Sequence, residues 1–228
     1  VTAQRLLGII DYSGIKRQQD IDITSETVRE QLRNCMELHR NAGFDEVFMA
    51  PMVCMLAYHT KVDKPFNYRD GLVDQLSSRY RFLRTLTLEV QVADPLALAV
   101  EEAHRAGLTF WGGYRMNDNV IHSFWSEPES LWPVIETDFH KNHPHYWLKD
   151  DNPDRGVRLT RPLSYAYPEV RRHVVDILME QVAYGVDGLL LDFMRFEYVS
   201  GFDPPALEIY SLMYGDYPSE EDERWWRI

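Results

Sequence analysis

Short apolar runs alternate along the chain with longer segments in which apolar residues recur at helical spacing. The apolar runs occupy residues 5–11, 44–50, 108–114 and 188–193. The first helical segment starts at Thr24 to Glu26, which supply a hydroxyl cap and an acidic first turn, and it stops at Gly43. Alternation of this kind predicts a parallel β-sheet whose strands are joined by helical crossovers.

Two further helices are predicted before the later apolar runs. Asp94 caps one of them, with Pro95 at its first helical position, and it runs to Gly107. The other runs from Pro168 to Gly185. Its expected buried stripe is Val170, Val174, Ile177, Leu178 and Val182. The run 188–193 is apolar up to its aspartate, a pattern typical of a strand buried on both faces.

The segment between residues 51 and 93 follows this alternation least well. We expect an inserted helix near residues 72–83. Residues 86–92 alternate between apolar and polar side chains, which is the period of a β-strand. We therefore predict a short strand there, in a hairpin outside the main sheet.

The pattern as a whole contains four strand–helix units, with the last helix near residues 204–214. A barrel of eight units typically needs about 250 residues, whereas here four units take almost all of the 228. We predict an α/β fold of the TIM-barrel type, as one domain over residues 1–228 that holds only the N-terminal half of the barrel. The open sheet edges of a half-barrel would favour self-association.

Charge and composition narrow the choice of partners. The formal net charge of −12 argues against nucleic acid, because phosphates select basic surfaces. No apolar run approaches the roughly 20 residues that span a bilayer, so no membrane partner is expected. No signal peptide is predicted within these residues. Cys35 and Cys54 lack metal-site spacing; two buried free thiols are favoured, and a disulfide stays open.

Polar and aromatic residues follow all four predicted strands, where ligands bind in parallel α/β architectures. They are Asp11 after the first strand, Tyr58 and His59 after the second, Tyr114, Arg115, Asn117 and Asp118 after the third, and Asp192, Arg195 and Glu197 after the fourth. We expect Asp11, Arg115, Asp118 and Asp192 to surround one cleft.

Asp192 is the strongest catalytic candidate in the sequence. A carboxylate that ends an apolar strand is costly to bury unless it has a partner. Arg195, three residues later, could pair with it, and an ionised carboxylate suits a nucleophilic or electrostatic role. The alternative is a structural aspartate that accepts hydrogen bonds from the amides of the next loop.

The residues from Tyr114 to Asp118 combine a guanidinium, an amide and a carboxylate, which suit the recognition of sugar hydroxyls. For Asn117 a loop that satisfies its own backbone is an equally good interpretation. Trp125 lies in a polar loop and is the better candidate to stack on a sugar ring, whereas Trp111 lies within a strand and is expected to pack in the core.

Other kinds of chemistry have little support in the sequence. His140, His143 and His145 match no standard zinc spacing, so no metal is expected. No serine lies in a Gly-x-Ser-x-Gly context, and no glycine-rich nucleotide motif occurs. We expect no cofactor of any other kind.

Three blocks of the sequence resemble the family-ten-like glycosyl hydrolases. They are residues 94–118, residues 139–171 and, as the most specific, residues 185–195, Gly-Val-Asp-Gly-Leu-Leu-Leu-Asp-Phe-Met-Arg. The resemblance covers about Asp94 to Arg195, with a weaker match over the first two strands. It implies a TIM barrel, a carbohydrate substrate and a secreted or periplasmic location.

Three functional hypotheses follow from these residues. The first is a glycoside hydrolase acting on an oligo- or polysaccharide, with Asp192 as one catalytic carboxylate and Asp118 or Glu197 as candidates for the other. Substrate would be bound by Asp11, Tyr58, His59, Tyr114, Arg115, Asn117, Trp125 and Arg195. The second hypothesis is a non-catalytic carbohydrate-binding or degenerate barrel. The third is a metal-dependent hydrolase, which requires the three histidines to converge with a carboxylate.

Overall fold

A four-stranded sheet lies at the centre of the computed structural model, which describes residues 5–12, 15, 22–50, 56–64, 75, 81–117, 136–149, 162–193 and 201–218. The strands are β1 (Leu7–Asp11), β2 (Glu46–Ala50), β3 (Thr109–Arg115) and β4 (Gly188–Asp192). All neighbours are parallel, and their order in the sheet is their order in the chain. This confirms the predicted α/β fold. Each crossover advances by one strand, as in a (β/α)-barrel and unlike a doubly wound sheet.

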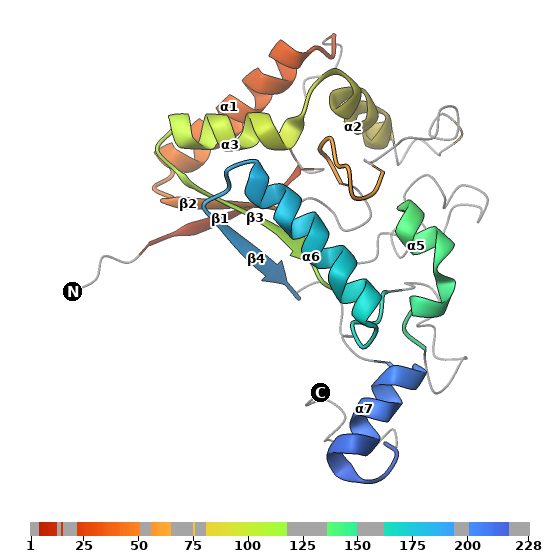
Figure 1. The fold of residues 1–228 in the computed structure, drawn as a ribbon. Coiled ribbons are helices and arrows are strands. Elements are labelled where there is room, and N and C mark those ends of the chain that lie inside the picture. Colours follow the sequence, from red (N-terminus) through yellow and green to blue (C-terminus); the bar gives the residue numbers. More distant parts are fainter. Residues whose placement is uncertain are drawn as a thin grey trace.

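The crossovers are made by helices that cover one side of the sheet. They are α1 (Ser25–Asn41), α2 (Arg81–Val92), α3 (Pro95–Arg105) and α6 (Pro168–Ala183). Figure 1 shows α1, α3 and α6 on the same side of the strands. Two predicted caps are present, because the Thr27 N–H donates to Thr24 Oγ1 (3.2 Å) and the Ala97 N–H donates to Asp94 Oδ1 (3.3 Å). These caps satisfy amides that a helix start leaves without intrahelical partners.

The main core lies between the sheet and these helices. Ile10, Val47 and Phe110 belong to it, together with Leu32 of α1 and Ile177 of α6. Strand side chains alternate between the two faces of a sheet, so their chain neighbours point the other way. That second face, called the far face here, carries Leu7, Ile9, Asp11, Glu46, Phe48, Trp111, Arg115, Leu190 and Asp192. Burial on it is uneven, because Ile9 is 49% exposed whereas Phe48 is fully buried.

Three local predictions are corrected by the structure. Among the described strands β4 lies at one edge of the sheet, and its Leu191 is exposed, so the strand is not buried on both faces. Residues 86–92 belong to helix α2, where Leu86 and Val90 are buried and Leu88 faces solvent. Their alternation of apolar and polar residues fitted a strand, but the buried residues Leu86 and Val90 are four residues apart, which is the spacing of a helix face. In α6 the buried stripe ends on Gln181, which is fully buried, whereas the predicted Val182 is exposed.

Three short elements lie beyond the carboxyl ends of the strands. They are α5 (Asp138–Asn142), the 3-10 helix η5 (Pro144–Tyr146) and α7 (Pro204–Tyr214). Figure 1 places α5 and α7 past the arrowhead of β4. Only α7 was predicted, and it packs through Ala206 and Tyr210 on a small separate cluster.

Two predictions from composition can be compared with the structure. Within the described residues, no helix is both long and apolar enough to cross a membrane. Cys35 is a free thiol and is half-buried rather than fully buried; burial raises its pKa. Cys54 lies outside the described residues.

Candidate active site

Asp11, Arg115 and Asp192 form a row across the carboxyl edge of the far face. The strand register sets Arg115 directly opposite Asp192. The Arg115 guanidinium donates from Nη2 to Asp11 Oδ2 (3.4 Å), and its Nε lies 3.6 Å from Asp192 Oδ2. Three of the four residues expected around one cleft therefore lie together, at the ends of strands β1, β3 and β4.

The row is a cation set between two anions in a poorly solvated place. The side chains of Arg115 and Asp192 are only 6% and 3% exposed, whereas that of Asp11 is 36% exposed. Buried charges are tolerated when they are paired, and this pairing meets that condition. Asp11 offers the accessible end of the row, and Asp192 the enclosed end.

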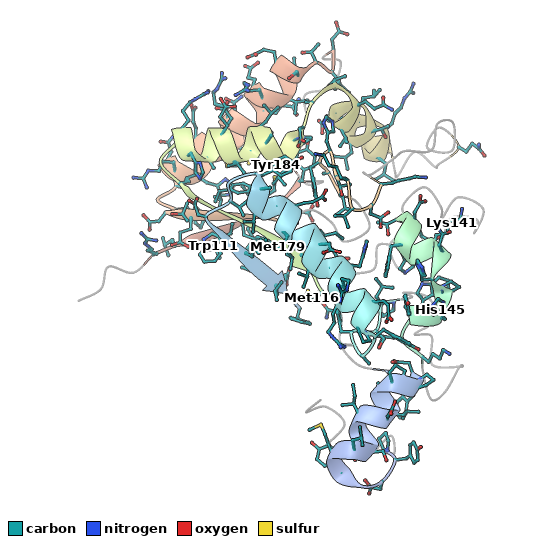
Figure 2. All side chains as sticks on the ribbon, in the orientation of Figure 1. Trp111, Met116, Lys141, His145, Met179 and Tyr184 are labelled. Carbon is teal, nitrogen blue, oxygen red and sulfur yellow. The ribbon has the colours of Figure 1, made fainter. Side chains whose placement is uncertain are left out.

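The chain just after β3 is fixed to its surroundings by three hydrogen bonds. The Met116 N–H donates to Asp192 O (2.7 Å), and the Tyr165 hydroxyl donates to Met116 O (2.7 Å). The Asn117 side-chain amide donates to Phe193 O (2.9 Å). Asn117 is thus buried and bridges the ends of β3 and β4. In Figure 2, Met116 lies at the end of the sheet to which β4 points.

Three other predicted binding residues lie apart from the row. Tyr114 is buried in the core on the helix-facing side, because the pleat sends it to the face opposite Arg115. Tyr58 is also in that core, and its hydroxyl donates to Glu180 Oε2 (3.3 Å). His59 contacts Val90 O through Nε2 (2.7 Å) and lies beside Asp94. These three residues therefore do not belong to the row.

Four predicted site residues lie outside the described residues: Asp118, Trp125, Arg195 and Glu197. Trp111 lies on the far face, half-buried, with its indole N–H donating to Glu46 Oε2 (2.8 Å). Arg5 donates to the other oxygen of the same carboxylate, at 2.8 Å. Glu46, Trp111 and Arg5 thus form a second polar group toward the amino ends of the strands.

The histidine-rich segment is held by local contacts rather than gathered around one point. His140 Nδ1 lies 3.6 Å from Glu136 Oε1, and His143 Nδ1 lies 2.8 Å from Phe139 O. The His145 ring packs against Tyr146, with centroids 4.1 Å apart. Among the described residues, no group of three or more His, Cys, Asp or Glu side chains could hold a metal ion. The convergence that the metal-dependent hypothesis requires is therefore not found in this part of the chain.

Asp63 ties this segment to helix α6. Its carboxylate accepts from the N–H groups of Asp138 (3.0 Å) and Phe139 (3.3 Å), and it lies 3.3 Å from His173 Nε2. Burial raises the pKa of Asp63, but hydrogen bonds from His173, Lys64 and Thr137 outweigh it and hold the pKa below its usual value. Asp63 is therefore an ionised anchor for the start of α5.

Two neighbouring residues of α6, Glu180 and Gln181, were not predicted from the sequence and bind to other segments of the chain. The Glu180 carboxylate accepts from Thr60 Oγ1 (2.6 Å) and from the N–H of Val62 (3.2 Å), and so holds the segment after β2. The Gln181 side chain bonds to the backbone of Gly113 in β3. A detectable signal was present, since residue 181 continues the spacing of the apolar stripe but is polar.

The comparisons with known proteins give only distant likenesses. The sequence matches no protein-family model and no curated protein. The structure is similar to a noncanonic maltogenic α-amylase, AmyB, from Thermotoga neapolitana, with a TM-score of 0.48 and 14% identity. It is also similar to a candidate α-amylase from Salmonella typhimurium, with a TM-score of 0.41 and 14% identity.

These likenesses cover 85% and 94% of this chain. The chain spans only 40% and 30% of the two amylase structures. Similarity of this size transfers no activity to this chain.

Proposed function

We propose that this chain is part of a glycoside hydrolase acting on an oligo- or polysaccharide, with Asp192 as a catalytic carboxylate. The observation that carries the proposal is the enclosed Asp192 at the carboxyl end of β4, beside the buried guanidinium of Arg115. Active sites of (β/α)-barrels lie at this end of the strands. The resemblance of residues 185–195 to the family-ten-like glycosyl hydrolases supports the same assignment.

Arg115 suggests which catalytic role Asp192 takes. A carboxylate beside a fixed positive charge acts as a nucleophile or electrostatic stabiliser rather than as a proton donor. In a retaining reaction its oxygen would attack the anomeric carbon while a second carboxylic acid protonates the departing oxygen. In an inverting reaction it would instead take a proton from the attacking water. Asp118 and Glu197 are the candidates for the second carboxyl group.

The remaining members of the row would bind the sugar. Asp11 is the accessible carboxylate and can accept hydrogen bonds from sugar hydroxyls. Arg115 is committed to two carboxylates, so its main effect is to orient them rather than to bind an anionic group. A neutral sugar therefore suits this row better than an acidic one. The alternative function, carbohydrate binding without hydrolysis, uses the same groups but lacks a competent second carboxyl group.

A substrate screen on the unmodified protein separates the two functions. Soluble neutral polysaccharides, such as β-glucan, xylan and starch, are incubated with the protein, and new reducing ends are measured. Binding to the same polymers is measured in parallel by affinity gel electrophoresis. Release of reducing ends supports the hydrolase. Retardation in the gel with no release would replace it by the binding function, and neither effect on any polymer would overturn both.

A further inference from the structure

The sheet divides into two ribbons at the edge that carries the row. The ladder between β2 and β3 ends where Phe48 faces Trp111. The ladder between β1 and β2 continues to Asp11, and that between β3 and β4 continues to Asp192. Asp11 therefore belongs to the β1–β2 ribbon, whereas Arg115 and Asp192 belong to the β3–β4 ribbon.

Gln181 of α6 fills the gap between these ribbons. The Gly113 N–H donates to Gln181 Oε1 (2.7 Å), and Gln181 Nε2 donates to Gly113 O (3.1 Å). Main-chain groups of alternate residues in a parallel strand point to alternate neighbours. The Thr109 N–H is directed to Asp45 O, on the β2 side, so the groups of Gly113 also face β2. The side-chain amide of Gln181 thus takes the place that a β2 residue would occupy in a continuous ladder.

Two adjacent glycines make room for this arrangement. A Cβ atom on Gly112 would lie 2.7 Å from Gln181 Oε1. A Cβ atom on Gly113 would lie 2.7 Å from the Phe48 ring and closer still to Leu190 O. Any larger residue at either position would displace the amide or the strand, so only glycine keeps this close approach.

We propose that Gln181 is a positioning residue, whose amide fixes the separation of the two ribbons and so sets how closely Asp11 approaches Arg115. Arg115 follows Gly113 by two residues and reaches across the gap to Asp11 at 3.4 Å. Its contact with Asp192, at 3.6 Å, lies within one ribbon and does not span the gap. A change in the gap therefore moves Asp11 relative to the other two members. The consequence for turnover rests on the proposed function, but the geometric statement does not.

The test replaces Gln181 with methionine, which has a similar length and cannot bond to Gly113. NMR follows the carboxyl carbon resonances of Asp11 and Asp192 and the exchange of the Gly113 amide proton. We expect the Asp11 resonance to shift while that of Asp192 stays in place. Exchange at Gly113 should become faster by about tenfold or more, because its amide loses its partner.

Glu180→Gln is the matched control. It weakens the bonds to residues 60–62 from the same turn of α6 but leaves the contact with β3 intact. We expect it to lower stability without moving the Asp11 resonance. If Gln181→Met does not fold, Gln181→Glu keeps the acceptor for the Gly113 N–H and should shift Asp11 in the same direction by less.

Two results would overturn the inference: an unchanged Asp11 resonance in the folded Gln181 variants, or equal shifts of Asp11 and Asp192. The release of reducing ends from the neutral polysaccharides gives a separate measurement. With the proposed function correct, Gln181→Met should lower kcat/KM on the order of 10- to 100-fold relative to Glu180→Gln, as misplaced catalytic groups do. No turnover by the unmodified protein, together with the selective Asp11 shift, would reject the hydrolase and leave the positioning role standing.

Discussion

The two faces of the sheet are built from the same four strands but use polar residues in different ways. On the helix-facing side, polar groups are matched within the chain, as the buried Gln181 is by Gly113 and the half-buried Glu180 by residues 60–62. On the far face, charges gather at the carboxyl edge in Asp11, Arg115 and Asp192, while Ile9 lies open to solvent. The first pattern explains how the chain holds its shape. The second pattern is harder to explain by stability alone, because buried ion pairs add little net stability.

Ile10 and Ile9 test the difference between the faces with one residue type on one strand. Ile10 is 4% exposed in the core, and its neighbour Ile9 is 49% exposed. We expect Ile10→Ala to lower the free energy of unfolding by about 2–4 kcal/mol, since it leaves a cavity. Ile9→Ala should cost less than about 1 kcal/mol. Urea denaturation of both variants gives the comparison.

Equal losses in the two isoleucine variants would mean that the far face around Ile9 is covered in solution. Self-association through the open sheet edges would have that effect, and it remains a prediction. Sedimentation velocity of the unmodified chain over a range of concentrations measures it directly.

Asp63 tests whether the polar contacts between α5 and α6 stabilise the fold. We expect Asp63→Asn to destabilise the protein by about 1.5–3 kcal/mol at neutral pH, because it removes charge-assisted bonds to the start of α5 and to His173. The lowered pKa means that the folded state binds the Asp63 proton more weakly than the unfolded chain. Its stabilising effect is thus present above the unfolded pKa of about 4 and is lost as the pH falls through the folded pKa. The cost of the substitution should therefore shrink toward pH 3.

Asp203, just before α7, should have the opposite pH dependence. Burial raises its pKa, against a bond from Ser164 Oγ to its Oδ2 (2.7 Å). The folded state then holds this proton more tightly than the unfolded chain, so stability is full below the unfolded pKa and falls as pH rises through the folded pKa. Urea denaturation at pH 3 and pH 8 measures this effect. Between the two pH values, the free energy of unfolding of Asp203→Asn relative to that of the unmodified protein should rise by about 1.4 kcal/mol for each pKa unit by which folding raises the pKa of Asp203. A difference independent of pH would contradict this account of Asp203.

The parts of the fold that the sequence predicted are those where several local signals agreed. Helix α3 has an aspartate cap, a proline at its first position and a glycine after its end, and it was placed within two residues. Residues 86–92 carried one signal, a polarity alternation that a helix could also satisfy, and the prediction there was wrong. Packing against the core, which no local pattern contains, decided between the two.

The candidate site follows the same division. Asp11, Arg115 and Asp192 could be predicted because parallel strands end at one edge, which the chain order alone implies. Tyr114 and Arg115 are neighbours in a strand and therefore point to opposite faces of the sheet. The sequence alone could not show which of the two faces the helices. The sequence marks Gln181 as a polar residue within an apolar stripe, but its partner is a backbone group 68 residues away, so the contact itself could not be predicted.

Two aspartates of the same strand region test the central claim most directly. Asp192 stands at the carboxyl end of β4, and Asp187 precedes its amino end, where it accepts from His104 and from the Phe110 N–H, each at 2.8 Å. The measurement is kcat on a polysaccharide that the unmodified protein cleaves, for Asp192→Asn and Asp187→Asn. We predict a loss on the order of 10³-fold or more for Asp192→Asn, with the fold retained, and less than about threefold for Asp187→Asn. Near-full turnover by a folded Asp192→Asn variant, or equal losses in both, would make Asp192 a structural residue and contradict the account.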